Sequence, residues 1–169
     1  MRTHYLFVAS LLAAAISPAA DVKQPSIDTA AAFSRLKSLA GEWNGGTAMG
    51  KAHVSYQVIA GGTAVVERET MEGMPEMMTV YHTDGKRLIL THYCMAGNQP
   101  RMQAASYTPA SGELQFRFLD ATNLASPADG HMHNASFRFV DDQHLIAEWQ
   151  FYENGQLKNT EKAQYTKVR

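Results

Sequence analysis

The sequence predicts a mainly β protein, an antiparallel up-and-down β-barrel of about ten strands with one N-terminal helix that caps it. Three observations predict this fold. Apolar residues recur at helical spacing up to Gly41, and from there to the end of the chain they alternate with a period of two. Short turn sequences separate the alternating segments at regular intervals, which is typical of consecutive hairpins. The first of these segments begins at Gly41-Glu42-Trp43, directly after the helical stretch.

Residues 1–20 are expected to form a cleaved secretory signal peptide. Arg2 and His4 give a weakly cationic start, and the apolar run from Tyr5 to Ile16 is too short to span a bilayer. Small residues at 17–20 provide a cleavage region, and the alternatives are an uncleaved anchor or a buried N-terminal helix. We therefore expect a periplasmic or secreted protein with a single barrel domain over residues 21–169 and no membrane span after cleavage.

Each element has its own marker in the sequence. Asp28 is a good N-cap for a helix over residues 28–40, and Gly41 ends that helix. Strands are expected over residues 42–166, and the longest loop, 120–130, is a candidate gate at the mouth of the barrel. An open sheet curled around the helix is the alternative architecture. Turns are predicted at Gly61-Gly62, Asp84-Gly85, 109–112, 141–143 and Asn154-Gly155.

Charge and cysteine content exclude several functions. The formal net charge is −1 at pH 7 without clusters of basic residues, so nucleic acids and anionic membrane surfaces are poor candidate partners. Cys94 is the single cysteine and cannot form an internal disulfide, and we expect its thiol to be buried.

Two stretches carry a resemblance to a known family. They are Leu36-Lys-x-Leu39-x-Gly41-Glu42-Trp43 and the ending Asp141-Asp-x-His144-Leu…Asn154-Gly155…Glu161-Lys-x-x-Tyr165-Thr166-Lys167. These resemble lipocalin-like, calycin-type bacterial exported domains of unknown function and, more distantly, nitrobindin-like haem-binding barrels. The resemblance implies ligand storage or transport. It also implies structural roles for Gly41 and Trp43, with Lys167 or Arg169 lying over the indole ring, a contact worth about 0.5–2 kcal/mol.

Strand alternation predicts which side chains point into the barrel. With a two-residue loop at Asp84-Gly85, Thr83 pairs with Lys86, and Tyr81, His92 and Cys94 share the more apolar face. A mostly apolar interior with few polar groups is the usual composition of a ligand cavity, and the alternative is a barrel that its own side chains fill. The residues expected to point into the barrel and to bind the ligand are Tyr81, His92, Phe116, Phe118, His131, His133, Phe137, Phe139, Trp149 and Phe151.

The expected function is non-covalent binding or carriage of a small hydrophobic or amphipathic molecule, without a cofactor. A first alternative is a zinc or copper site formed by His92, Cys94, His131 and His133, or a haem site. A second is an envelope scaffold or protein-interaction module. Enzyme activity is not expected, because the sequence has no Gly-x-Ser-x-Gly motif, phosphate loop or dinucleotide fingerprint. Glu67 and Glu69 are interpreted as solvated strand residues.

Overall fold

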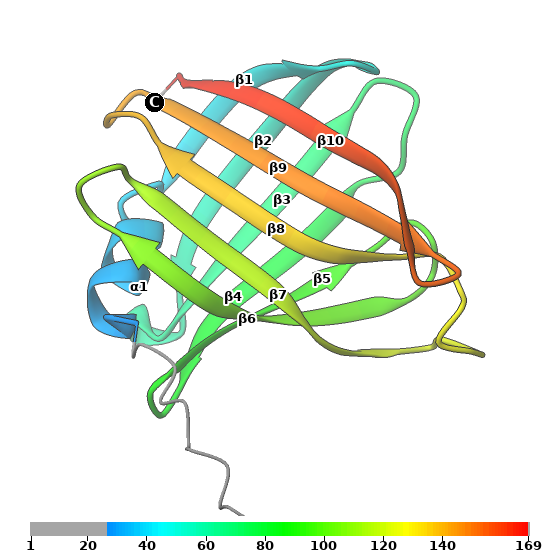
Figure 1. Cartoon of the computed structure of the whole chain (residues 1–169). Coiled ribbons are helices and arrows are strands. Elements are labelled where there is room, and N and C mark those ends of the chain that lie inside the picture. Colours follow the sequence, from blue (N-terminus) through cyan, green and yellow to red (C-terminus); the bar gives the residue numbers. More distant parts are fainter. Residues whose placement is uncertain (1–26, 169) are drawn as a thin grey trace, which may run out of the picture.

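A computed structural model describes residues 27–168, which form a closed barrel of ten antiparallel strands with one helix near the N-terminus (Figure 1). The expected signal peptide lies outside these residues. Consecutive strands pair with each other, and β1 pairs with β10 to close the ring, so the open-sheet alternative is wrong. The elements are α1 (Thr29–Lys37), β1 (Gly41–Thr47), β2 (Gly50–Ile59), a 3-10 turn (Ala60–Gly62), β3 (Ala64–Met71), β4 (Met77–Asp84), β5 (Arg87–Tyr93), β6 (Gln99–Thr108), β7 (Glu113–Thr122), β8 (His131–Phe139), β9 (His144–Glu153) and β10 (Gln156–Lys167).

Helix α1 covers one end of the barrel, and the loop between β7 and β8 lies at the opposite end (Figure 1). The Asp28 carboxylate accepts a hydrogen bond from the amide of Ala31, as expected of an N-cap. The helix ends at Lys37, three residues before the predicted end. Phe33 and Leu36 are buried against the barrel, and Arg35 binds Asp142 at 2.8 Å. Within residues 27–168, no helix is long and apolar enough to cross a membrane.

Trp43 closes the same end of the barrel from inside. Its ring is 1% exposed, and its Nε1 donates a 2.7 Å hydrogen bond to the carbonyl of Leu39. Lys167 is its partner across the β1–β10 pair, and the Lys167 Nζ atom lies 5.3 Å from the centre of the ring. The expected contact between the indole and a basic residue near the C-terminus is confirmed.

The β4–β5 hairpin differs from the prediction by one residue on each strand. Asp84 pairs with Arg87 and Tyr81 with Leu90, so the two loop residues are Gly85 and Lys86. Gly85 has a φ of +58°, which glycine adopts readily. Because the shift preserves the alternation, the predicted inward face is still correct. Six of its members are buried, and Cys94 beyond the end of β5 is partly buried; the six are Met77, Thr79, Tyr81, Leu88, Leu90 and His92.

Aromatic rings from opposite walls meet in the centre of the barrel. The ring centres of Tyr81, Phe116 and Phe137 are each 6.0 Å from one another, and Trp149 lies 5.9 Å from Phe137. All four side chains are at most 7% exposed. Edge-to-face and tilted contacts at these distances are favourable, so these residues form a packed core.

Candidate functional site

Strands β7 and β8 part at the end of the barrel opposite the helix. Their pairing ends at Arg117 and Asn134, although both strands continue. Beyond this point β7 remains paired with β6 through Thr122, and β8 remains paired with β9 through His131. The segments 118–122 and 131–133 therefore face each other across a gap that is not closed by strand hydrogen bonds.

A pocket of about 510 Å³ occupies this gap, and we call it the mouth pocket. It brings together three of the residues predicted to bind a ligand, Phe118, His131 and His133. The predicted gate loop supplies much of the remaining wall. Its other lining residues are Leu119, Asp120, Ala121, Leu124, Ala125, Ser126, Pro127, Tyr152 and Gly155.

A β-bulge in β8 determines how the histidines are presented. Met132 pairs with Phe151 and Asn134 with Gln150, so His133 is an extra residue without a partner in β9. Phe151 of β9 faces inward, and Met132 pairs with it, so Met132 also faces inward. The predicted alternation, which placed His131 on that interior face, is wrong at this point, because one inserted residue reverses the faces. His131 pairs instead with Tyr152 and is 5% exposed.

The two imidazoles form a hydrogen-bonded chain. His131 Nδ1 lies 2.8 Å from the carbonyl oxygen of Asp129, and His131 Nε2 lies 3.0 Å from His133 Nδ1. The His133 ring is stacked between Phe118 and Tyr152, with ring centres 4.6 and 4.4 Å away. Burial, and then the neighbouring His131, lower the pKa of His133, so its neutral form is favoured.

The loop over this pocket is held by specific contacts. The Asp129 carboxylate accepts hydrogen bonds from the amides of Ala125 and Ser126, at 2.8 and 3.0 Å. The Asn98 side chain donates a 2.8 Å bond to the carbonyl of Gly130, and the amide of Asn154 donates one to Ala128. The loop is therefore tied to its own turn, to the β5–β6 connection and to the β9–β10 hairpin.

Most of the other predicted ligand-binding residues lie away from this pocket. Tyr81, Phe116, Phe137 and Trp149 belong to the packed core described above. Phe139 is buried near the helix end, with the Arg35 guanidinium 5.2 Å from its ring centre. The remaining two are Phe151 and His92. The Phe151 ring lies so close to Gly130 that a side chain there would overlap it, and the His92 ring makes a tilted contact with Trp149 at 4.8 Å.

The barrel interior contains a polar network that the sequence interpretation missed. Glu67 is 4% exposed and accepts a 2.6 Å hydrogen bond from the Tyr81 hydroxyl, and Tyr56 and Thr79 also bond to it. Burial raises the pKa of Glu67 to about 8, with a further contribution from Glu69. The interpretation of Glu67 and Glu69 as solvated residues is wrong, because β3 turns both carboxyl groups inward.

This network extends to His92 and to β10. Thr79 Oγ1 lies 3.0 Å from His92 Nδ1, and burial lowers the pKa of His92 to about 4. The Tyr165 hydroxyl donates a short hydrogen bond to Glu69. Within residues 27–168, His92 Nε2 and the Glu161 Oε1 atom are buried without a hydrogen-bond partner.

The candidate metal ligands do not form one group. His131 and His133 contact each other, whereas His92 contacts Thr79 and Trp149. Cys94 follows the end of β5 and is only partly buried, so the expectation of a fully buried thiol is wrong; burial still raises its pKa. In the part of the chain that the structure describes, no three His, Cys, Asp or Glu side chains are arranged to hold a metal ion.

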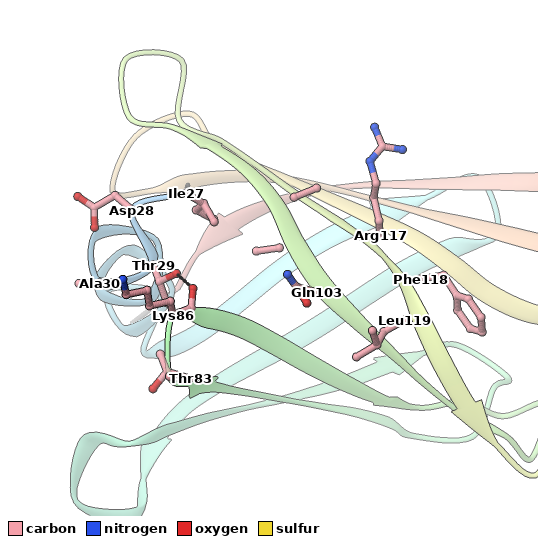
Figure 2. A pocket seen from close by; sticks show the side chains of 13 residues that line it. Ile27, Asp28, Thr29, Ala30, Thr83, Lys86, Gln103, Arg117, Phe118 and Leu119 are labelled. Atoms are coloured by element: carbon pink, nitrogen blue, oxygen red, sulfur yellow. Dashed lines mark hydrogen bonds between the residues drawn. The ribbon is translucent and has the colours of Figure 1, made fainter. Parts of the chain in front are cut away.

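A second groove, with a larger volume of about 880 Å³, lies between the start of α1 and strands β6 and β7. It begins at the start of α1, where Thr29 donates a hydrogen bond to the Lys86 carbonyl, and extends along β6 and β7 to Phe118 and Leu119 (Figure 2). Strands β5 and β6 pair only between 89–91 and 101–103, which leaves this side open. Of the predicted ligand-binding residues, only Phe118 lines it.

Comparisons with known proteins support the fold. No protein-family model and no curated protein matches the chain. The structure is similar to the crystal structure of Rv2717c from M. tuberculosis, with a TM-score of 0.58 and 16% identity over 84% of this chain and 100% of that one. It is also similar to a protein of unknown function from the DUF3598 family of Nostoc punctiforme, with a TM-score of 0.54 and 12% identity over 79% of this chain. The match spans 49% of the Nostoc chain. At these identities the similarity concerns the fold alone.

Proposed function

We propose that this protein binds a small amphipathic molecule, without covalent chemistry, in the mouth pocket. The observation that carries the proposal is the juxtaposition of Phe118, His133 and Tyr152 in a pocket of about 510 Å³. Ligand pockets typically measure about 300–1,000 Å³ and combine apolar walls with a few polar groups that fix orientation.

The walls and the polar groups come from different elements. Leu119, Leu124 and Pro127 supply apolar surface from β7 and the loop, while the imidazole chain on β8 supplies hydrogen-bonding capacity. The packed core lies deeper in the barrel, so a ligand would enter between β7 and β8 instead of replacing the core. The loop contacts through Asp129 and Asn98 would hold the outer wall in place.

The cellular setting and the family belong to the same proposal. Residues 1–20 have the pattern of an export signal, so we place the binding activity in the periplasm or outside the cell. The helix, Gly41-x-Trp43 and the Lys167 contact are consistent with a calycin-type barrel, a group that stores or carries small molecules.

Titration with N-phenyl-1-naphthylamine, a neutral apolar fluorophore, tests the proposal. Ala125 lines the pocket and is exposed, whereas Ala128 is exposed on the same loop but is not part of the lining. We expect saturable one-to-one binding by the wild type and by Ala128→Trp, and at least tenfold weaker binding by Ala125→Trp. Equal binding by all three proteins would contradict the mouth pocket as the site.

Metal or haem binding is the alternative function, and His133 supports it best. Its Nε2 atom forms no hydrogen bond within residues 27–168, while both nitrogens of His131 are engaged. Elemental analysis and the visible absorption spectrum of the purified chain test this alternative. A stoichiometric metal, or a Soret band, that is lost in His133→Phe would show that the protein binds a metal or haem instead of an amphipathic molecule.

A further inference from the structure

The hydrogen-bonded chain of His131 and His133 fixes which nitrogens carry protons. The Asp129 carbonyl oxygen can only accept a hydrogen bond, so the His131 Nδ1 atom that lies 2.8 Å from it must carry a hydrogen. In neutral His131 the other nitrogen, Nε2, then has a lone pair and can only accept.

The position of the hydrogen on His133 follows from that on His131. Its Nδ1 atom lies 3.0 Å from His131 Nε2 and therefore carries the hydrogen that this bond requires. In neutral His133 the remaining nitrogen, Nε2, has a lone pair and no hydrogen. The carbonyl of Asp129 thus determines, through two rings, that the outermost nitrogen of the chain is an acceptor.

The position of this nitrogen makes it available to a ligand. His133 lines the mouth pocket, and Nε2 has no hydrogen-bond partner in the part of the chain that the structure describes. Phe118 and Tyr152 cover the two faces of the ring at interplanar angles of 14° and 26°. With both faces covered, the ring offers its edge, and the stacked neighbours restrict its rotation.

The charged residue in the lining of this pocket, Asp120, is also an acceptor. Asp120 lines the pocket and forms an ion pair with Arg101. The hydrogen bond from Arg101 lowers the pKa of Asp120, so its carboxylate is ionised at neutral pH. Ser126 and Tyr152 bring hydroxyl groups to the same pocket, but the His133 lone pair and the Asp120 carboxylate are acceptors that disfavour an anionic ligand. The ion pair with Arg101 offsets the charge of Asp120, so a cation is not favoured either.

We infer that the ligand is an uncharged molecule with an apolar or aromatic body and one hydroxyl or N–H group, which donates a hydrogen bond to His133 Nε2. This inference rests on the proposed function and specifies the class of ligand. His133 is the binding residue, and His131 is a positioning residue that acts through the tautomer of His133.

Three matched probes test the inference by isothermal titration calorimetry at pH 8 with EDTA present. 2-Naphthol can donate a hydrogen bond, 2-methoxynaphthalene cannot, and 2-naphthoate is an anionic acceptor. We expect wild-type protein to bind naphthol at least tenfold more tightly than methoxynaphthalene, which corresponds to about one hydrogen bond, and naphthoate most weakly. Equal affinities, or a preference for naphthoate, would overturn the inference and leave the proposed function intact. Failure of all three probes to bind would overturn both.

The variant His133→Phe separates the hydrogen bond from the stacking. Phenylalanine retains a ring between Phe118 and Tyr152 but has no lone pair, so methoxynaphthalene should bind as before and the preference for naphthol should fall to less than twofold. His82→Phe, on a partly buried position of β4 outside the mouth pocket, is the matched control and should keep the wild-type preference. A naphthol preference that survives in His133→Phe would assign the hydrogen bond to another group and overturn the inference.

The role of His131 has a spectroscopic test that does not depend on any ligand. In long-range ¹H–¹⁵N spectra at pH 8, His133 Nε2 should have the shift of an unprotonated nitrogen in the wild type. In His131→Phe, the Nδ1–H group of His133 loses its acceptor. We therefore expect a mixture of His133 tautomers and a smaller preference for naphthol. A protonated Nε2 in the neutral wild-type ring would overturn the inference.

Discussion

Inside the barrel, the hydroxyl of Tyr81 donates a 2.6 Å hydrogen bond to the carboxyl group of Glu67. Glu67 is almost fully buried, and its other neighbours in this network, Tyr56 and Thr79, are hydrogen-bonding hydroxyl groups without a positive charge. Its pKa of about 8 means that the protonated form predominates at neutral pH. The interior therefore holds a carboxyl group that ionises in the range where most proteins are studied.

The first prediction concerns the pH dependence of stability through Glu67. The folded-state pKa is raised, so between about pH 4.5 and pH 8 the folded protein holds a proton that the unfolded chain has released. The stabilisation that comes from the protonated Glu67 carboxyl group is fully present below the pKa of Glu67 in the unfolded chain. It is lost as the pH rises through the pKa of Glu67 in the folded protein. We expect urea denaturation to show Glu67→Gln gaining stability relative to wild type by about 1 kcal/mol or more from pH 5 to pH 8. Glu113→Gln, on an exposed position, should show no such gain, and parallel profiles for all three proteins would contradict the prediction.

The second prediction concerns Trp43. Trp43→Ala removes a buried ring and the hydrogen bond to Leu39, and should lower the free energy of unfolding by about 3–5 kcal/mol. Lys167→Ala removes only the cation contact and should cost about 0.5–1 kcal/mol. Guanidinium denaturation measures both, and an unchanged midpoint for Trp43→Ala would show that the ring does not close the barrel end.

The third prediction separates the packed core from the mouth pocket. Phe137→Ala should lower the free energy of unfolding by about 3–5 kcal/mol, because Phe137 touches Tyr81, Phe116 and Trp149. Phe118→Ala should cost much less stability, since Phe118 is only partly buried, and should weaken naphthalene-probe binding at least tenfold. If Phe137→Ala weakened probe binding and Phe118→Ala did not, the ligand would lie in the core.

The fourth prediction concerns the contact between Gly45 and Tyr165. A Cβ atom at Gly45 would overlap the Tyr165 ring and the Gln164 carbonyl, so the ring lies directly over the glycine. Gly45→Ala must displace this ring and break its hydrogen bond to Glu69, and we expect a loss of about 2–4 kcal/mol in thermal or chemical denaturation. Gly46→Ala, at a position with more room, is the control and should cost about 1 kcal/mol or less. A similar loss for both variants would contradict the specific role of Gly45.

Much of the fold is predictable from local sequence features. Hairpin turns such as Asn154-Gly155, with φ of 54° and 67°, are marked by residues that tolerate positive φ. Trp43 and Lys167 are predictable from the family resemblance. The exact β4–β5 register is not, because Asp84-Gly85 resembles a turn while Asp84 pairs with Arg87 across the strands.

The site is less predictable, for two physical reasons. The bulge at His133 reverses the strand faces, and no residue pattern in 131–134 marks it, so Tyr152 was missed as a neighbour of the histidines. Glu67 follows Val65 with the spacing of an inward residue, but a carboxyl group is stable there only because hydroxyl groups from β2 and β4 meet it. These hydroxyl groups are far from Glu67 in the sequence and come next to it only in the closed barrel, so the sequence alone does not reveal the contact.

Native mass spectrometry of the protein purified from its own host, compared with the mass after denaturation, detects whether a molecule is bound in the mouth pocket. We predict a reproducible excess mass from a small organic molecule, retained by Ala128→Trp and lost from Ala125→Trp. An excess that persists in Ala125→Trp would place the ligand elsewhere in the barrel. No excess in any of the three proteins, at protein concentrations at which the naphthalene probes also fail to bind, would contradict ligand binding altogether.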